Sequence, residues 1–215
     1  MAMKKGLFIV FEGPDRSGKS TQVRLLSDWL IKNRLKPVLT REPGGARISE
    51  AIRDILLDPK NKISPLTELL LYEAARAQHT ADIILPALKA GKIVISDRFT
   101  MATTAYQGYG RKLDLKTVET LNRIATAGLK PDLTVVFTMP DSEFFRRGKN
   151  LKSDRMERQD TAFRLRVNKA YSILAARPGS FRVDATGSVQ DIHAAITSRL
   201  SAKFNIIHST FTRLP

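Results

Sequence analysis

The sequence contains no cysteine. A disulfide, a thiolate nucleophile and a cysteine-based zinc site are therefore excluded, and the absence suits a reducing compartment, so we expect a cytoplasmic protein. Long apolar runs are also lacking. No stretch reaches the ~18 consecutive apolar residues that indicate a transmembrane helix, so we expect no membrane association.

Acidic residues are scarce relative to basic ones. The chain of 215 residues has 36 Lys and Arg but only 21 Asp and Glu, which gives a formal net charge of +15. A positive surface attracts anionic substrates and equally attracts nucleic acid, so charge alone leaves both open. The basic residues are spread along the chain without a nucleic-acid-binding signature, so we expect no specific nucleic-acid binding.

Apolar runs alternate with segments of helical periodicity along the whole chain, which predicts one α/β domain over residues 1–215 with a parallel sheet. The 42% hydrophobic content is sufficient for a sizeable core. Residues 204–215 are uneven in pattern, and we expect a loose tail there. The predicted strands cover residues 6–12, 37–41, 92–96, 132–138 and 181–184.

Residues 13–21 read Gly-Pro-Asp-Arg-Ser-Gly-Lys-Ser-Thr, a full G-x-x-x-x-G-K-[ST] motif directly after the apolar run 7–11. A glycine-rich turn between a strand and a helix points backbone N–H groups and the positive helix end into one concavity that holds phosphates. Lys19 would reach the outer phosphates and the Ser20 hydroxyl would ligate Mg²⁺. A chance glycine turn is the alternative, and the expected strand and helix around the motif argue against it.

Two further features narrow the class of P-loop protein. No Asn-Lys-x-Asp motif is present, which argues against a GTPase, and Asp97 is followed by Arg98, which favours binding a second phosphate over activating water. The charged segment 146–158 reads as a solvated loop by composition, but beside a P-loop it also fits a lid that closes over phosphates. Phosphoryl transfer between two nucleotides is therefore the leading hypothesis.

With these residues in view, the sequence resembles the thymidylate kinase family over nearly its whole length. The resemblance implies a three-layer P-loop kinase fold, with a five-stranded parallel sheet flanked by helices on both faces. It also implies ATP- and Mg²⁺-dependent phosphorylation of thymidine monophosphate to the diphosphate, for dTTP synthesis, by a homodimer. Five blocks carry it: Phe11–Thr21, Thr40-Arg41-Glu42-Pro43-Gly44-Gly45, Tyr72-Glu73-Ala74-Ala75-Arg76, Asp97-Arg98-Phe99 and Ala105-Tyr106-Gln107-Gly108.

Two further blocks, Asp154-Arg155-x-Glu157 and 183–186, lie where the family keeps lid and adenine contacts. The resemblance assigns Mg²⁺ to Ser20 and Asp97, with Asp97 either holding the ion through water or orienting Arg98. The ATP-binding residues that it implies are Gly13, Pro14, Asp15, Arg16, Ser17, Gly18, Lys19, Ser20, Thr21, Arg146, Asp184 and Ala185.

On the acceptor side, Arg98 and Arg53 match family positions that grip the phosphate of the acceptor, for which a guanidinium fork is well suited. Asp15 matches an acid that accepts a hydrogen bond from the sugar 3′-hydroxyl. Tyr72 matches an aromatic that stacks on thymine, although its apolar neighbours alone would suggest core. The remaining substrate contacts implied by the resemblance are Arg41, Pro43, Arg76, Thr103, Tyr106 and Gln107.

Family members place a catalytic arginine either in the P-loop or in the lid. Gly148 and Asn150 stand where relatives with a lid arginine have basic residues, so we predict that Arg16 supplies the catalytic charge and Arg155 assists. A solvent-facing loop residue is the alternative for Arg16. Lys19 and Arg98 complete the predicted catalytic set.

Two other functions remain open on the sequence. One is a kinase for another nucleoside monophosphate or for a deoxynucleoside. The other is a nucleotide-binding protein with vestigial catalysis and a basic surface that attracts nucleic acid.

Overall fold

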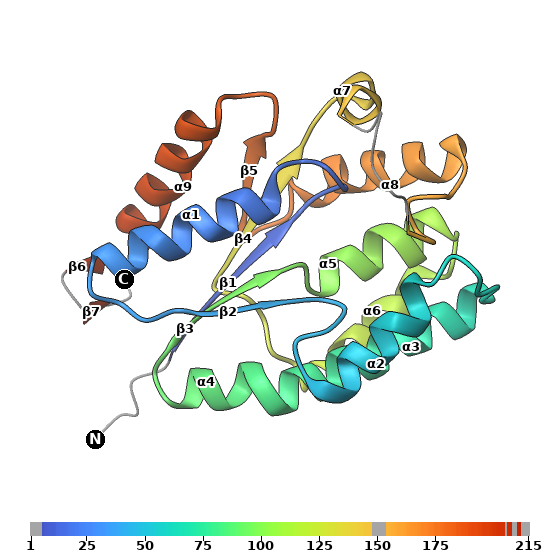
Figure 1. Ribbon diagram of the computed structural model, residues 1–215, viewed down its shortest axis with the longest axis horizontal. Coiled ribbons are helices and arrows are strands. Elements are labelled where there is room, and N and C mark those ends of the chain that lie inside the picture. Colours follow the sequence, from blue (N-terminus) through green and yellow to red (C-terminus); the bar gives the residue numbers. More distant parts are fainter. Residues whose placement is uncertain (1–5, 148–153, 205, 208–209, 212–215) are drawn as a thin grey trace.

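Five strands pair in parallel in the order β2-β3-β1-β4-β5 (Figure 1). The computed structural model describes residues 6–147, 154–204, 206–207 and 210–211. Every predicted strand is confirmed, with ends that differ by no more than one residue. The strands are β1 (Leu7–Glu12), β2 (Val38–Arg41), β3 (Ile93–Asp97), β4 (Leu133–Thr138) and β5 (Ser180–Asp184).

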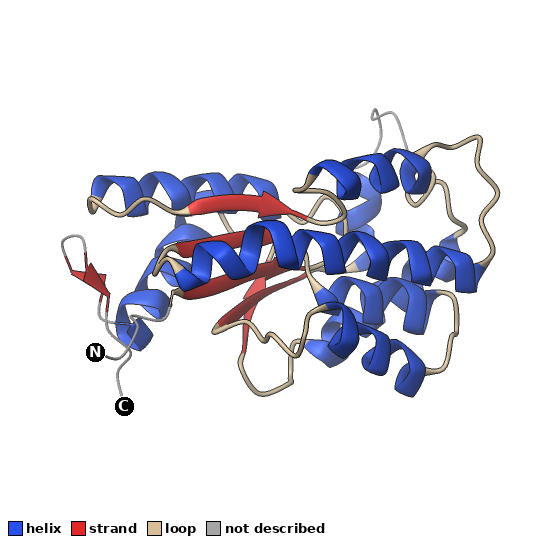
Figure 2. Cartoon of the chain, turned by 90° about the horizontal axis from the view of Figure 1, so that it is seen from below, coloured by secondary structure: helices blue, strands red, loops and turns tan. Residues whose placement is uncertain are grey.

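Helices cover both faces of this sheet, which confirms the expected three layers (Figures 1 and 2). Two π-helical segments, η1 and η2, continue the helices that precede them. The helical elements are α1 (Lys19–Lys32), α2 (Arg47–Leu57), α3 (Pro65–His79), η1 (Thr80–Ile84), α4 (Leu85–Lys89), α5 (Thr100–Thr103), η2 (Thr104–Gly110), α6 (Leu115–Ala125), α7 (Asp141–Arg146), α8 (Thr161–Leu174) and α9 (Val189–Phe204).

The central strand β1 is fully buried and divides its side chains between the two layers, because successive residues of a strand point to opposite faces. Leu7, Ile9 and Phe11 join the core with apolar residues of α1 and α9. Phe8 and Val10 join the opposite core with residues of η1 and α4. A continuous apolar run is the expected signature of such a two-sided strand.

The parallel arrangement brings the carboxyl ends of the strands to one edge, where ligands bind in open α/β sheets. Phe11 near the end of β1 lies opposite Asp97 at the end of β3. The P-loop after β1 and the turn after β3 are therefore neighbours.

The end of the chain differs from the expected loose tail. Phe204 is the buried last residue of α9, and Ile206 is buried as well. Ile206–Ile207 (β6) pairs antiparallel with Thr210–Phe211 (β7). The rest of the stretch expected as a tail lies outside the described residues.

Candidate functional site

The P-loop links the end of β1 to the start of α1, as its motif predicts. Gly13 (φ 144°) and Gly18 (φ 87°) adopt backbone conformations that side chains disfavour. A Cβ on Gly13 would also lie 2.7 Å from the carbonyl oxygen of Phe137 in β4. Glycine is therefore required at position 13, where the loop leaves the sheet. Gly18 then forms the turn into α1.

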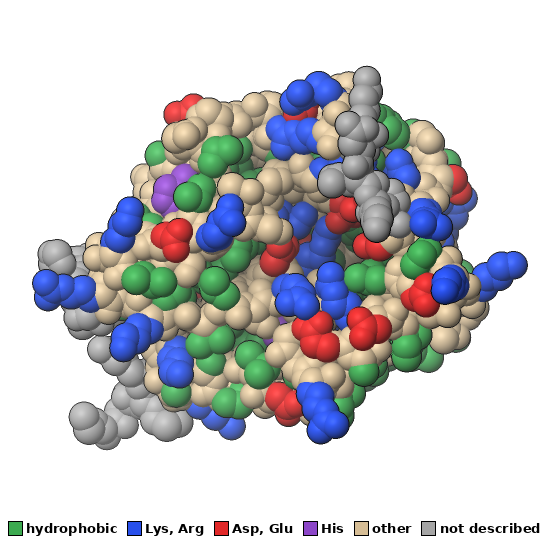
Figure 3. All heavy atoms as spheres, viewed as in Figure 1, with side chains coloured by type: hydrophobic (Ala, Val, Ile, Leu, Met, Phe, Trp, Pro, Cys, Tyr) green, Lys and Arg blue, Asp and Glu red, His purple; other side chains and the backbone are tan. Residues whose placement is uncertain are grey.

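A cavity of about 560 Å³ opens at the carboxyl edge of the sheet beside this loop. Figure 3 shows it as a hollow in which basic and acidic side chains gather. It is bounded by the P-loop and also by residues of β2, α2, α3, η2 and the segment 154–157. The predicted site residues that line it are Asp15, Arg16, Gly18, Lys19, Ser20, Thr21, Arg41, Pro43, Arg53, Tyr72, Arg76, Asp97, Arg98, Thr103, Tyr106 and Gln107.

Lys19 is buried in the P-loop, where its Nζ donates to the carbonyl of Pro14 at 2.7 Å. Burial and the nearby charge of Arg98 lower the pKa of its ammonium group to about 8, against the opposing effects of Asp97, Asp15 and Glu12. An anionic group in the cavity would stabilise the charged form of Lys19. The amine is thus suited to bind phosphate.

Ser20 and Asp97 meet at the junction of α1 and β3. The Ser20 Oγ donates to Asp97 Oδ2 over 2.6 Å. Mg²⁺ prefers such oxygen ligands and takes the rest of its shell from phosphates and water. The described residues contain no group of three or more His, Asp or Glu side chains that could hold a metal by themselves. This pair therefore fits an ion whose remaining ligands come from a nucleotide and water.

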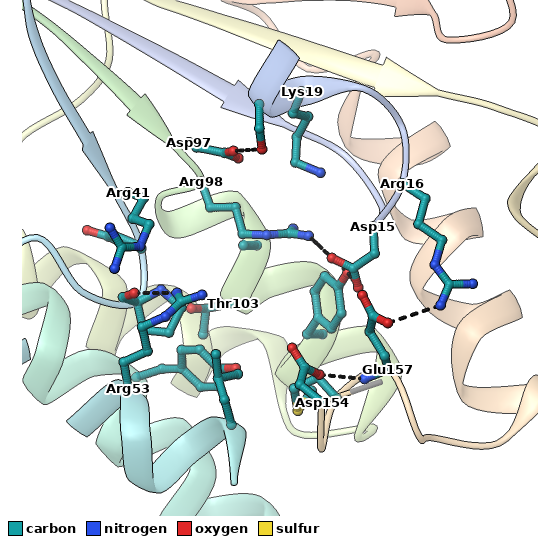
Figure 4. Close-up of a pocket in the computed structure, with 18 of the residues that line it drawn as sticks. Asp15, Arg16, Lys19, Arg41, Arg53, Asp97, Arg98, Thr103, Asp154 and Glu157 are labelled. Atoms are coloured by element: carbon teal, nitrogen blue, oxygen red, sulfur yellow. Dashed lines mark hydrogen bonds and ion pairs between the residues drawn. The ribbon is translucent and has the colours of Figure 1, made fainter. Parts of the chain in front are cut away.

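Arg98 lies at the centre of the cavity (Figure 4). It forms an ion pair with Asp15 and donates to the carbonyl of Gly13 at 3.0 Å. Asp15 also accepts from the hydroxyl of Tyr106 at 2.8 Å. Burial would raise the pKa of Asp15, but Arg98 and Lys19 hold it below its usual value, so the carboxylate is charged at neutral pH.

A second arginine faces the cavity from α2. Arg53 Nη1 donates to the carbonyl of Pro43 at 2.7 Å, and the side chain lines the cavity (Figure 4). Arg41 is more exposed and pairs with Glu50 at 2.8 Å. The cavity thus has a group of guanidinium ions opposite the P-loop.

The far side of the cavity is suited to hold a planar polar ring. Arg76 is fully buried and paired with Glu42 (2.8 Å) and Glu73 (2.7 Å), so its orientation is fixed. Tyr72, one turn earlier on α3, is half-buried. The hydroxyl of Thr103 is buried and has no hydrogen-bond partner within the described part of the chain, which leaves it available to a ligand.

Comparison with known proteins agrees with this geometry. The family model described as Thymidylate kinase matches residues 11–196. The chain belongs to the thymidylate kinase family. A protein named thymidylate kinase from Prochlorococcus marinus is 45% identical over 203 residues, which cover 91% of this chain and 96% of that protein. Another from Pelotomaculum thermopropionicum is 48% identical over 199 residues, covering 88% and 90%.

A solved structure supports the same assignment. The crystal structure of thymidylate kinase from Ehrlichia chaffeensis is 32% identical, has a TM-score of 0.73, and covers 92% of this chain and 99% of that one. The chain is therefore a kinase of this family. Among the described residues, none of the helices combines the length and hydropathy that a membrane crossing requires.

Within this thymidylate kinase fold, Arg16 lies at the rim of the cavity. Its Nη2 pairs with Glu157 at 3.0 Å, and its guanidinium stacks 5.1 Å from the ring centroid of Phe144. Figure 4 shows the side chain turned towards Glu157 rather than towards Lys19. Among the described residues its buried Nε has no hydrogen-bond partner, so this donor remains available to a ligand.

Arg155, which is predicted to assist catalysis, is not among the residues that line the cavity. Its Nε donates to the carbonyl of Leu56 at 2.6 Å and its Nη1 to Glu68 at 2.5 Å. Glu68 is completely buried and also pairs with Arg111 at 2.9 Å. The attraction of this buried carboxylate explains why Arg155 points into the protein, where it links its own segment to α2 and α3.

Arg146 is also placed differently from the expectation. Its side chain is 70% exposed and pairs with Glu143. Arg147 instead donates to the backbone carbonyls of Arg16 (3.2 Å) and Ala185 (2.7 Å), and it lines the cavity. Arg147 thus connects the end of α7 with the P-loop and with the loop after β5.

Other predicted ATP contacts lie beside the cavity rather than on its wall. Gly13, Pro14 and Ser17 shape the P-loop itself. Asp184 is exposed and accepts from Thr186 N at 2.9 Å, while Ala185 is buried and donates from its N to the carbonyl of Thr138 at 2.9 Å. The lid positions Gly148 and Asn150 lie outside the described residues.

Sequence reasoning missed several residues at this site. Arg147 and the lining residues Glu42, Asp154 and Glu157 were not predicted as site residues, although the last two stand in a block that the resemblance had marked. For Glu42 the signal was its place in the Thr-Arg-Glu-Pro-Gly-Gly block. Nothing in the sequence distinguished Arg147 from Arg146.

Proposed function

We propose that this chain transfers the γ-phosphoryl group of ATP to thymidine monophosphate, giving ADP and thymidine diphosphate. The observation that carries the proposal is one cavity with a phosphate-binding loop on one wall and Arg98, Arg53, Tyr72 and Arg76 facing it. In this proposal two nucleotides bind there with their phosphates facing each other. Membership of the thymidylate kinase family supports thymidine monophosphate as the acceptor.

In this proposal the electrostatics of the P-loop wall offset the repulsion between two polyanions. Lys19 binds the outer phosphates of ATP, and Arg98 and Arg53 bind the phosphate of the acceptor. Positioning and charge stabilisation are most of what an enzyme supplies to phosphoryl transfer. Arg16 lies in the same loop. In this proposal its guanidinium releases Glu157 and then contacts the transferring phosphoryl group.

Mg²⁺ is the proposed metal, held by Ser20 and Asp97 together with phosphate oxygens. The bound ion would neutralise charge that develops on the phosphates. The oxygen pair at 2.6 Å supports this assignment.

The proposed base pocket consists of Tyr72, Arg76, Thr103 and Gln107. Tyr72 stacks on thymine, and Arg76 and the hydroxyl of Thr103, which has no partner among the described residues, hydrogen-bond to its polar edge. Asp15 accepts from the sugar hydroxyl. An aromatic face with a few fixed donors is the usual basis of base recognition.

A panel of nucleoside monophosphates tests the reaction, with ATP, Mg²⁺ and a coupled assay of ADP release. Turnover should be fastest with thymidine monophosphate. Faster turnover of uridine or guanosine monophosphate would show that thymidine monophosphate is not the preferred acceptor. No turnover together with tight, salt-sensitive DNA binding would instead favour a vestigial nucleotide-binding protein, for which no feature of the cavity argues.

We also propose that two copies associate through α2 and α3, which pack against each other. These helices expose Ile48 (54%), Ile55 (47%), Leu66 (54%) and Leu70 (48%). Grouped exposed apolar side chains mark interaction surfaces, and the resemblance implies a homodimer. Leu70→Glu should produce monomers in light scattering, whereas Ile31→Glu, exposed on α1, should leave the dimer intact; dimeric Leu70→Glu would contradict this surface.

The cytoplasm is the proposed location, since a chain without cysteine suits a reducing compartment.

A further inference from the structure

Glu12 is a completely buried carboxylate at the end of β1, immediately before the P-loop. The alternation of the strand places it on the same face as Phe8 and Val10, which belong to an apolar core. A charge at such a position is unfavourable unless hydrogen bonds stabilise it. Its partners therefore indicate what it does.

Both carboxylate oxygens of Glu12 accept hydrogen bonds from parts of the chain that surround Arg98. Oε1 accepts from the backbone N–H groups of Phe99 (2.8 Å) and Ala102 (3.1 Å), at the start of α5. Oε2 accepts from the hydroxyl of Tyr171 on α8 at 3.2 Å. Glu12 thus joins β1, the turn after β3 and α8.

The turn that Glu12 holds has a strained residue at its centre. Arg98 has φ 74°, a left-handed conformation that costs a non-glycine residue about 1–2 kcal/mol. Three hydrogen bonds fix the backbone around it: Arg98 N to Phe11 O (2.8 Å), Ser96 Oγ to Arg98 O (2.7 Å) and Phe99 N to Glu12. The conformation directs the side chain of Arg98 into the cavity.

The guanidinium of Arg98 is connected to the same carboxylate through Tyr171. Arg98 Nη1 donates to the Tyr171 oxygen at 3.0 Å, and the Tyr171 hydroxyl donates onward to Glu12. The carboxylate therefore fixes both the backbone and the side chain of Arg98.

We propose that Glu12 is a positioning residue that holds Arg98 in the orientation needed to bind the phosphate of the acceptor nucleotide. The inference rests on the proposed role of Arg98. Because Glu12 also precedes Gly13 directly, it keeps the P-loop and the acceptor-binding arginine at a fixed separation. A misplacement of about 1 Å at such a site costs on the order of 100-fold in rate, which is why rigid support matters.

The ionised form of Glu12 is the one that these donors suit, since all three partners donate to it. Burial raises the pKa of Glu12 to about 7, against the opposing effects of Arg98, the backbone N–H groups and Lys19. The other titratable groups of this cluster are Tyr171, Asp15 and Tyr106. Protonation of Glu12 below neutral pH would remove an acceptor and loosen Arg98.

The test compares steady-state kinetics of Glu12→Gln, Tyr171→Phe, Arg98→Ala and Asp132→Asn with wild type. Glutamine keeps an oxygen for Phe99 and Ala102, but its amide cannot accept from Tyr171. Asp132→Asn is the matched control, because Asp132 also accepts a backbone N–H of β1, that of Phe8 at 2.9 Å, at the opposite end of the strand.

Glu12→Gln should raise KM for thymidine monophosphate about tenfold, with KM for ATP changed by less than about twofold. Tyr171→Phe should shift the same KM in the same direction by less. Asp132→Asn should match wild type in both. In wild type, kcat/KM for thymidine monophosphate should decrease as the pH is lowered below about 7, because Glu12 becomes protonated. This ionisation should be missing from Glu12→Gln. The ionisation of the substrate phosphate near pH 6 should appear in both proteins.

A wild-type KM for thymidine monophosphate in Glu12→Gln, an equal rise in both KM values, or the same effect in Asp132→Asn would overturn the inference. If Glu12→Gln does not fold, a wild-type KM in Tyr171→Phe would overturn it. Arg98→Ala separates the proposed role of Arg98 from that of Glu12. An unchanged KM for thymidine monophosphate in Arg98→Ala refutes the role of Arg98 itself. A large rise in Arg98→Ala without one in Glu12→Gln refutes only the role of Glu12.

Discussion

The Ser20 hydroxyl donates a 2.6 Å hydrogen bond to the Asp97 carboxylate, although the two residues stand on different elements of the fold. β1 and β3 are neighbours in the sheet, so the first turn of α1 lies beside the end of β3. This contact joins the phosphate-binding loop to the turn that contains Arg98. It also places a hydroxyl and a carboxylate oxygen side by side at the edge of the cavity.

If these oxygens help to hold Mg²⁺, Asp97→Asn and Ser20→Ala should each raise the Mg²⁺ concentration required for half-maximal activity. The asparagine keeps the shape of the side chain but loses the charge that attracts a hard cation. Mg²⁺ titrations of ADP release measure this. Ser27→Ala, two turns further along α1, is the control; an unchanged Mg²⁺ requirement in both site variants would exclude this pair.

Arg16→Ala should lower kcat at least about a hundredfold, because a guanidinium at the transferring phosphate stabilises charge that develops in the transition state. Arg155→Ala should act mainly on stability, since it leaves the buried Glu68 with one cation fewer. Single-turnover rates and urea unfolding of both variants separate these effects. A mild loss of kcat at Arg16 with a severe one at Arg155 would reverse the assignment.

Asp15→Asn should reduce the preference for thymidine monophosphate over its 3′-deoxy analogue. The carboxylate of Asp15 is charged and reaches the cavity, where it can accept from a sugar hydroxyl. The ratio of kcat/KM for the two acceptors measures the preference in each protein. Asp58→Asn, outside the cavity, should keep the wild-type ratio, and a variant Asp15→Asn that also keeps it would show that Asp15 serves only Arg98 and Tyr106.

The buried Glu12 should make stability depend on pH. Burial raises its pKa from 4.5 to about 7 in the folded protein, so the folded state binds the proton more tightly than the unfolded state does. The contribution of Glu12 to the free energy of unfolding therefore falls as pH rises from about 4.5 to 7, by about 3 kcal/mol in total. Urea unfolding of wild type and Glu12→Gln between pH 5 and 8.5 should show wild type losing stability relative to the variant as pH rises, and a constant difference would contradict the shift.

Much of the fold was predictable because its signals are local. Continuous apolar runs mark strands buried on both faces, and the P-loop motif fixes where β1 ends and α1 begins. The cavity brought together most of the predicted site residues, including Arg53, Tyr72 and Thr103, which stand far from the P-loop in sequence.

The placement of a side chain differs from the expectation where several partners compete for it. Arg146 and Arg147 are adjacent in sequence, but a helical step turns successive residues by about 100°, so only one of them faces the cavity. Arg155 is drawn to Glu68, which is 87 residues away in sequence. Spacing alone does not encode either outcome.

The sequence by itself determined the class of the protein: five parallel strands, a phosphate-binding loop after the first, and the blocks of the thymidylate kinase family. Only the tertiary structure decided which charges face the cavity and which are paired within the protein. Glu12 illustrates the difference, since it reads as one polar residue at the end of an apolar strand. Its two backbone donors and Tyr171 come from distant segments, and their convergence makes a buried carboxylate both tolerable and useful.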